Sequence, residues 1–214
     1  MFDRIPEPEL MLNESQCITY NQSLINNNEA LSRFIRTYKK YIGVFEGSVV
    51  DLGSGSANFI IELCKAYPNL SVTCYESSSA MIKIANKNIS ENNLQDRITI
   101  IQDDFFNAKG NFDVVIANRV LHHVNNTERF WSLINSLSKN ILICDLERPK
   151  ELKYIKDKFD IDVKNSFKAA YNISEVKDQT RLYNYNVLRE KVGDELFTFI
   201  VYQNKNNVSS LTTP

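Results

Sequence analysis

VVDLGSGSANFIIELCKAYPNLSVTCYESSSAM, residues 49–81, holds the most informative pattern in this chain of 214 residues. A short apolar run leads into Gly53-Ser54-Gly55, and a segment with helical periodicity follows over 59–66. A second apolar run, 72–75, ends at Glu76. The order of strand, glycine turn, helix and strand predicts one βαβ unit, whose two strands run parallel.

The loop of this unit has the composition of a ligand site. Gly53 and Gly55 lack Cβ atoms and so allow a ligand to approach the backbone closely. The helix that follows directs free N–H groups toward the same place. An acid about 20 residues further on, at the end of the second strand, accepts hydrogen bonds from ribose hydroxyls in nucleotide-binding folds. Glu76 occupies that position, so we expect a cofactor that contains a nucleoside.

The identity of the cofactor follows from what the loop lacks. A dinucleotide fingerprint requires a third glycine, and Asn58 stands there instead. The chain has no phosphate-binding loop of the Walker type. Asp51 lies two residues before the first glycine, where a carboxylate disfavours a pyrophosphate and favours a cation. S-adenosylmethionine carries a ribose, a sulfonium and an ammonium but no phosphate, and it fits this pattern better than NAD.

The pattern Asp51-Leu-Gly53-Ser-Gly55 with Glu76 resembles the class I, Rossmann-like methyltransferases that use S-adenosylmethionine. Segments 98–105 and 112–123 extend the resemblance over roughly residues 45–145. The chain looks like the small bacterial type-11 and type-12 members. The resemblance implies S-adenosylmethionine as cofactor, S-adenosylhomocysteine as product, and an α/β fold. That fold is a seven-stranded, mostly parallel, doubly wound sheet with an antiparallel last strand and N-terminal helices.

The resemblance also implies a set of cofactor contacts. They are Asp51, Gly53, Ser54, Gly55, Glu76, Ser77, Met81, Asp104, Phe105 and Asn118. Asp104 is preferred to Asp103 as the acid near the adenine amino group, although Asp103 replaces a glycine of the family pattern. Asn118 is expected near the methyl donor. N6-adenine and glutamine methyltransferases have two prolines directly after this position, but residues 119–121 read RVL, so a flipped amine is not supported as the acceptor.

Catalytic residues are harder to identify, because methyl transfer by in-line displacement needs mainly alignment and desolvation. His123, Asp145 and Tyr20 are weak candidates. Tyr20 reaches the site only if the N-terminal helices cover it. No metal site is expected, because the adjacent His122 and His123 cannot share one face of an α-helix and no partner spacing suggests zinc.

The rest of the chain is expected to form one domain. Residues 1–44 should form an arm and helices covering the cofactor site, 45–203 the cofactor-binding domain, and 204–214 a flexible tail. Further helices are expected over 13–41, 78–92 and 127–138, and a short one over 175–179 with Ser174 as its N-cap. Further strands are expected over 98–101, 112–117, 140–144, 182–189 and 196–202, the last two joined as a hairpin through 192–194.

Composition limits the other properties. Net charge is −1, which argues mildly against nucleic acid as the main partner, and a small-molecule acceptor is expected. The four cysteines form no C-x-x-C pair, and no signal peptide or membrane span is evident, so we expect a cytoplasmic protein. Two alternatives remain: a non-catalytic protein that uses the fold as an interaction platform, and a nucleic-acid or protein methyltransferase. The acceptor and the oligomeric state stay open.

Overall fold

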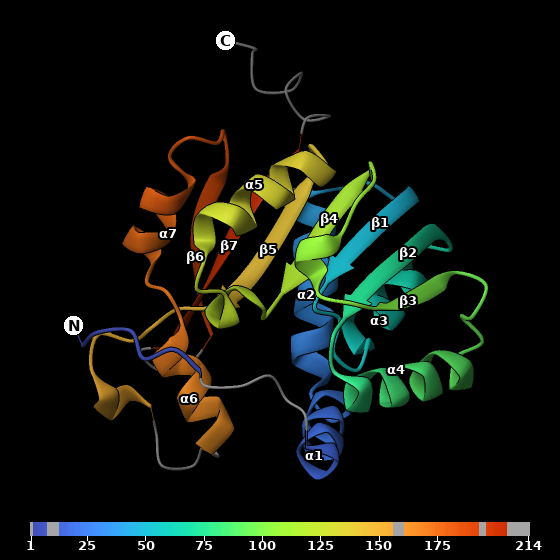
Figure 1. Ribbon diagram of the computed structural model, residues 1–214, viewed down its shortest axis with the longest axis horizontal. Helices are drawn as coiled ribbons and strands as arrows, with labels where there is room; N and C mark the ends of the chain where they lie inside the picture. The colour runs from blue at the N-terminus through green and yellow to red at the C-terminus, as the bar shows by residue number, and fades with distance from the viewer. Residues whose placement is uncertain (1, 8–12, 156–160, 193–195, 205–214) are drawn as a thin grey trace.

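The computed structural model describes residues 2–7, 13–155, 161–192 and 196–204. It contains a seven-stranded sheet with helices on both faces (Figure 1). The strands are β1 Glu46–Leu52, β2 Asn69–Glu76, β3 Ile98–Gln102, β4 Val114–Asn118, β5 Ile141–Leu146, β6 Asn186–Lys191 and β7 Phe197–Gln203. The α-helices are α1 Glu14–Ile25, α2 Asn28–Tyr41, α3 Asn58–Ala66, α4 Ser79–Glu91, α5 Thr127–Leu137, α6 Ile161–Ala169 and α7 Ile173–Thr180. Three 3-10 turns complete the set: η1 Phe105–Asn107, η2 Leu121–His123 and η3 Leu152–Tyr154.

The strand order is β3-β2-β1-β4-β5-β7-β6. Strands β1 to β5 pair in parallel, and β7 is antiparallel to both β5 and β6. The expected sheet, including its antiparallel last strand, is confirmed. The chain moves from β1 outward to β3 and then returns to place β4 beside β1. Ligands of open α/β sheets bind at the carboxyl ends of the strands beside such a reversal, which here are the ends of β1 and β4.

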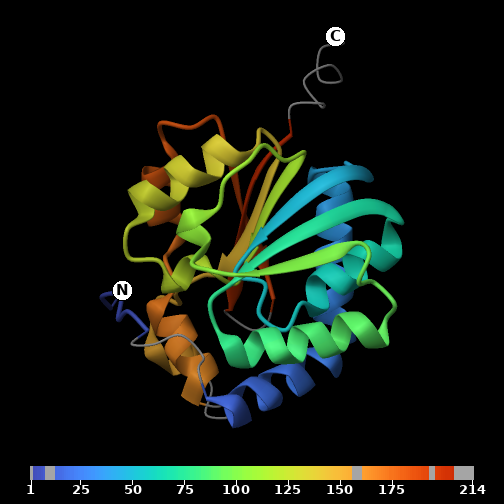
Figure 2. The same ribbon diagram turned by 45° about the vertical axis from the view of Figure 1, so that its right-hand side comes forward.

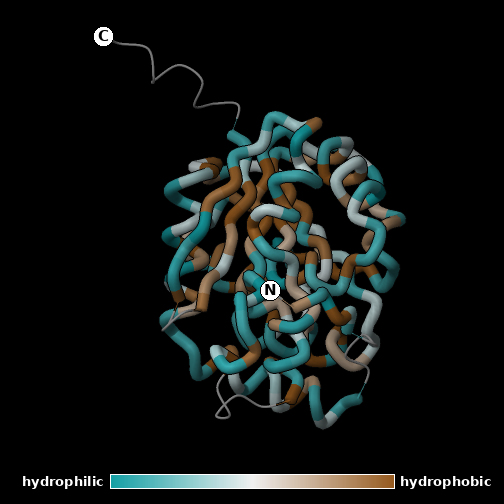
Figure 3. The backbone as a smooth tube through the Cα atoms, turned by 90° about the vertical axis from the view of Figure 1, so that its left-hand side faces the viewer, coloured by the Kyte–Doolittle hydropathy of each residue, from teal (hydrophilic) through white to brown (hydrophobic). Residues whose placement is uncertain are grey.

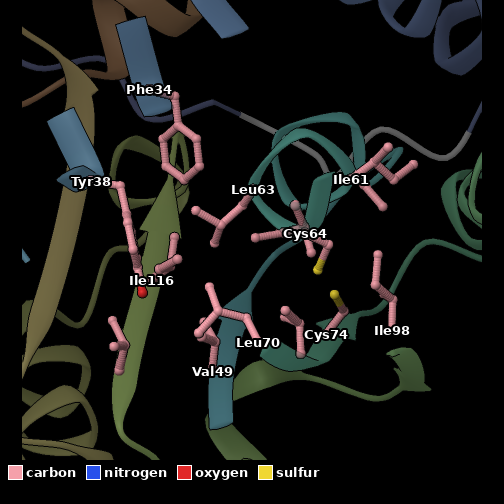
Figure 4. Packing of buried hydrophobic residues seen from close by; sticks show 14 of the residues in the cluster. Phe34, Tyr38, Val49, Ile61, Leu63, Cys64, Leu70, Cys74, Ile98 and Ile116 are labelled. Carbon is pink, nitrogen blue, oxygen red and sulfur yellow. The ribbon is translucent and has the colours of Figure 1, made fainter. Parts of the chain in front are cut away.

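Alternating side chains of the strands build two cores. On one face, Val49 and Ile116 pack with α2, α3 and α4, and Figure 4 shows Phe34, Tyr38 and Leu63 in this cluster. On the other face, residues such as Val50 pack with α5 and α7. In Figure 3 the strands at the centre are hydrophobic, whereas much of the surrounding chain is hydrophilic. Burial on both faces explains why the parallel strands are continuous apolar runs.

Two local expectations are wrong. Strand β6 begins at Asn186, four residues later than expected, because residues 182–184 form a turn. Helix α7 is capped by Asn172 and not by Ser174. Asn172 and Glu175 form a capping box, in which the Glu175 carboxylate accepts a hydrogen bond from the Asn172 N–H at 2.8 Å. This reciprocal pair satisfies two backbone donors, which a Ser174 cap would leave unpaired.

Residues 2–7 form an extended arm that lies beside α6, and α1 lies against α4 (Figure 2). None of the four cysteines, all of which lie in the described residues, forms a disulfide, and three of them are buried. No helix within the described part of the chain is long and apolar enough to cross a membrane. Residues 193–195 of the expected hairpin loop and 205–214 of the expected tail lie outside the described residues.

Candidate functional site

The loop after β1 is shaped by two glycines with positive φ, 75° at Gly53 and 54° at Gly55. The N–H of Gly53 donates to the carbonyl oxygen of Tyr75 at 2.8 Å, which fastens the loop to the end of β2. A Cβ on Gly53 would lie 2.7 Å from a methyl of Val120, whereas a Cβ on Gly55 would meet no atom within 4 Å. Gly53 is therefore required by packing, and Gly55 borders open space in which a ligand can lie against the backbone.

Glu76, at the end of β2, joins the glycine loop to the start of α4. One carboxylate oxygen accepts the N–H of Gly55 at 2.8 Å, and the other accepts the N–H of Ser78 at 2.8 Å. Of the neighbouring predicted contacts, Ser77 is exposed and Met81 is buried in the first turn of α4. Glu76 therefore has a structural role in addition to the expected contact with a ribose.

Asp51 is the second acid of the site and is only 4% exposed in β1. Burial raises the pKa of its carboxyl group to about 8, and repulsion from Glu76 adds to the increase. Burial without a counterion favours the neutral form of Asp51, and the negative charge of Glu76 adds to this effect. A cation near Asp51 would remove this penalty, which agrees with the expectation that the loop favours a cationic ligand.

An asparagine network holds α1 against the glycine loop. The side-chain oxygen of Asn21 in α1 accepts hydrogen bonds from the amide groups of Asn58 at 2.7 Å and Asn88 at 2.9 Å. The Asn58 amide also donates to the Ser56 hydroxyl, and the Asn88 amide to the Ser56 carbonyl. Sequence reasoning treated Asn58 only as a break in the dinucleotide pattern. Its contacts show that it fixes both the loop and the first helix.

The end of β3 carries the predicted adenine site. Asp104 is exposed, and its carboxylate accepts the N–H of Phe106 at 2.9 Å as the N-cap of η1. Asp103 accepts the N–H of Asp104 at 2.8 Å and also the side-chain amide of Asn107. Phe105 is partly buried and packs against Phe106 and Phe130. Both acids are thus at the carboxyl edge, and nothing in these contacts selects one as the adenine ligand.

Asn118 ends β4 at the reversal of strand order. Its side-chain nitrogen is buried and has no hydrogen-bond partner among the described residues. Asn118 and Asp145 line a small pocket of about 60 Å³ together with Phe34, Phe59 and Arg119. A buried donor without a partner costs free energy, so this position is suited to a ligand that accepts a hydrogen bond.

His122 and Asp145 form a buried pair that sequence reasoning missed. The Nδ1 atom of His122 lies 2.7 Å from one carboxylate oxygen of Asp145, and the His122 backbone N–H donates to the other at 2.9 Å. Burial acts to raise the pKa of Asp145, but the charge and hydrogen bonds of His122 outweigh it and hold that pKa below its usual value. Asp145 is therefore ionised and fully engaged, which makes it a poor proton acceptor.

The N-terminal arm reaches this pair. Arg4 donates hydrogen bonds to the carbonyl oxygens of His122 at 2.8 Å and Ala169 at 2.6 Å, and its guanidinium lies over the ring of Tyr171. These contacts place the Glu7 carboxylate 3.0 Å from Nδ1 of His123 and 3.6 Å from Nε2 of His122. The sequence argument against a metal assumed an α-helix, but a 3-10 turn lets both imidazoles face Glu7.

The three weak catalytic candidates are therefore in different surroundings. His123 is one-third exposed and contacts Glu7. Both carboxylate oxygens of Asp145 are in hydrogen-bond contact with His122. Tyr20 lies half-buried on α1. His123 follows β4 and Asp145 lies near the end of β5, so both are at the same edge of the sheet as the glycine loop.

Comparison with known proteins gives a family match over part of the chain. The family of methyltransferase domains named Methyltransf_12 matches residues 50–140. A release factor glutamine methyltransferase of Rhodopirellula baltica is 32% identical over 33% of this chain and 25% of its own. A ribosomal RNA small subunit methyltransferase C of Haemophilus influenzae is 32% identical over 36% of this chain and 23% of its own. The chain thus spans about a quarter of the length of these two relatives.

Solved structures match over most of the chain. A candidate S-adenosyl-L-methionine-dependent methyltransferase from Methanococcus maripaludis superposes with a TM-score of 0.67 and 19% identity, over 95% of this chain and 99% of the other. The plantazolicin methyltransferase BpumL, in complex with a desmethylPZN analogue and SAH, gives 0.65 and 17%, over 86% and 89%. Residues 50–140 match the methyltransferase-domain family, and the chain as a whole has the fold of these solved methyltransferase structures.

Proposed function

We propose that this protein binds S-adenosylmethionine and transfers its methyl group to a small molecule. The observation that carries the proposal is the loop of Gly53 and Gly55, braced by Glu76 at the carboxyl edge of the sheet. The family match over 50–140 and the SAH complex of the structural neighbour BpumL support the choice of cofactor.

The residues present fit this cofactor. Open space at Gly55 leaves room for it, and the free side-chain nitrogen of Asn118 offers a donor to its carboxylate. Glu76 is placed to accept hydrogen bonds from the ribose, and the buried Asp51 gains a counterion from the cofactor's cationic end. When bound, the cofactor supplies a methyl group on a positively charged sulfur. The chain then has to orient the acceptor and exclude water.

A small molecule is favoured as the acceptor for two reasons. The segment after Asn118 reads RVL and lacks the prolines of glutamine and N6-adenine methyltransferases, although one relative is a glutamine methyltransferase. The pocket between α2 and the ends of β4 and β5, lined by Asn118 and Asp145, is far smaller than the 300–1,000 Å³ or so of a drug-sized site. A compact acceptor needs the least displacement of Arg119, which also lines it.

Ribosomal RNA is the second candidate acceptor. The net charge of −1 argues against a nucleic-acid partner. However, a relative in Haemophilus influenzae is an rRNA methyltransferase. The relatives therefore do not support the expectation that nucleic acid is excluded as a partner. RNA binding would weaken steeply with salt, because each phosphate contact releases counterions. Binding of an RNA hairpin that falls more than tenfold between about 50 and 200 mM salt would favour this second candidate.

The replacement Glu76→Ala tests the cofactor site. It leaves the N–H groups of Gly55 and Ser78 and the ribose hydroxyls without their acceptor. We expect affinity for S-adenosylhomocysteine to fall by about 1–3 kcal/mol. Calorimetric titration measures this, with NAD as a ligand that should not bind. Glu62→Ala removes a partly exposed acid paired with Lys65 and should bind like the natural protein. Equal affinity of Glu76→Ala and the natural protein would remove Glu76 from the site.

Cofactor affinity should also depend on pH through Asp51. The pKa of about 8 means that this carboxyl is mostly protonated at neutral pH in the free protein. A bound cation favours the ionised form, so binding releases a proton, and affinity should rise by up to about tenfold per pH unit until pH 8, then level off. Titrations across this range check the slope, and Asp51→Asn should flatten it. A slope that persists in Asp51→Asn would assign the proton to another group.

A further inference from the structure

The N-terminal arm and η2 bring three ligand atoms together outside the glycine loop. These are the Oε2 atom of Glu7, the Nε2 atom of His122 and the Nδ1 atom of His123, all within 4.8 Å of one another. The side chains are 12%, 5% and 33% exposed, respectively. Glu7 is 115 residues away from His122 in the sequence, so only the docked arm creates the cluster.

Asp145 orients the first imidazole. Its carboxylate lies 2.7 Å from Nδ1 of His122, which places the proton on Nδ1 and leaves the lone pair of Nε2 directed away from Asp145. Nε2 is the atom on the Glu7 side. A histidine that donates one ring N–H to a buried carboxylate while its other nitrogen binds a metal is a common arrangement, because the carboxylate fixes the ring and increases its basicity.

The spacing of the ligand atoms suits an ion between them. Oε2 of Glu7 lies 3.0 Å from the nitrogen of His123 and 3.6 Å from that of His122. Tetrahedral zinc with bonds of about 2.0–2.1 Å keeps neighbouring ligand atoms about 3.3 Å apart. Oε2 is also buried, and apart from the two imidazole nitrogens it has no polar partner within the described residues. An ion between these three atoms would bind the oxygen and both nitrogens at once.

The arm is held in place independently of this cluster. Four hydrogen bonds of Arg4 and one from the N–H of Ile5 to the Lys168 carbonyl anchor it to η2, to the two residues that follow η2, and to α6. The other oxygen of Glu7 accepts the hydroxyl of Ser166 at 3.0 Å. The contacts of Arg4 and Ile5, together with the hydrogen bond from Ser166, therefore hold the Glu7 carboxylate beside the two histidines.

We propose that Glu7, His122 and His123 bind a divalent transition-metal ion of the zinc class, with a fourth position open to water. Two imidazole nitrogens and one carboxylate oxygen suit zinc better than magnesium or calcium, which prefer oxygen ligands alone. The one-third exposure of His123 leaves the site reachable from solvent. The ion links the arm to the carboxyl edge of the sheet, beside the pocket lined by Asp145. This site does not depend on the proposed methyl transfer.

The test is a titration of the full chain, stripped of metal with a chelator, with zinc in a calorimeter. We expect one ion per chain. Glu7→Gln keeps the size of the side chain but removes its charge, and it should weaken zinc binding by at least about 100-fold, since loss of supporting groups around a site already costs 10–100-fold. Glu14→Gln is the matched control, because Glu14 is another N-terminal acid whose partner is Lys83. It should bind zinc like the natural protein.

A second readout separates a metal site from a simple ion pair. Cobalt added in place of zinc should give the visible absorption of a four-coordinate ion, and His123→Asn should abolish it. Absence of zinc uptake by the natural chain, or equal zinc affinity in Glu7→Gln, would overturn the proposal and leave an arm fastened by an ion pair. Far-ultraviolet circular dichroism of the same variants checks that the chains are folded, and its result depends neither on the zinc result nor on the proposed function.

Discussion

Replacing Gly55 by valine should reduce the affinity for S-adenosylhomocysteine by at least about 100-fold while the protein still folds. A Cβ at this position meets no protein atom within 4 Å, so the new side chain occupies the space assigned to the cofactor. The N–H of Gly55 also holds Glu76 in position. Each lost or displaced polar contact costs about 1–3 kcal/mol, and steric exclusion adds to this.

The control for Gly55→Val is Gly43→Val. Gly43 has a similar positive φ, 65° against 54°, and a Cβ there makes only ordinary contacts. It precedes β1, so it lies at the amino edge of the sheet, away from the glycine loop. Both variants should lose a similar amount of stability, about 1–3 kcal/mol for a side chain in this backbone region. Only Gly55→Val should lose the cofactor. Normal cofactor binding by Gly55→Val would contradict the placement of the ligand.

Replacing Asp145 by alanine should lower the free energy of unfolding by about 3–5 kcal/mol, a large part of the 5–15 kcal/mol that domains typically have. The change removes the partner of a buried imidazole and leaves the N–H groups of His122 and Leu146 without an acceptor. Chemical denaturation in the presence of a chelator measures the loss. Asp96→Ala removes an exposed carboxylate and should change stability by less than about 0.5 kcal/mol.

The same pair should make stability depend on pH. The pKa of Asp145 is lower in the folded protein than in the unfolded chain, so its ionised form stabilises the fold above the unfolded pKa of about 3.9. That contribution is lost as the pH falls through the lower, folded pKa. Part of the acid sensitivity of the natural protein should be missing in Asp145→Asn. A natural protein and an Asp145→Asn variant with parallel stability curves below about pH 5 would contradict this assignment.

The parts of the fold that depend on residues close together in the sequence were predictable from the sequence alone. The glycine turn, the strands around it and the position of Glu76 follow from apolar periodicity and from the conformational freedom of glycine over some 30 residues. The hydrogen bonds of Glu76 to Gly55 and Ser78 did not follow, because they depend on how the loop folds back on β2. The Asn-x-x-Glu pattern of Asn172 and Glu175 indicates the observed cap, whereas Lys177 stands three residues after Ser174.

The cluster of Glu7, His122, His123 and Asp145 was not predictable in the same way. Its members are separated by up to 138 residues, and no spacing rule connects them. Sequence reasoning considered His123 and Asp145 as separate catalytic candidates and excluded metal on the assumption of an α-helix. The 3-10 turn and the docked arm, which tertiary contacts produce, change which atoms face one another.

The pairing of β5 with β7, and the docking of the arm on α6, have a consequence for how the protein is made. Arg4 leaves the ribosome before its acceptor Ala169, which follows 165 residues later. The edge of β5 likewise stays unpaired until β7, Phe197–Gln203, has been synthesised. Because chains fold from the N-terminus as they are synthesised, β1 to β5 emerge before the strand that covers their edge. Until then the growing chain exposes an apolar strand that can pair wrongly, and the arm can dock only after Ala169 has emerged.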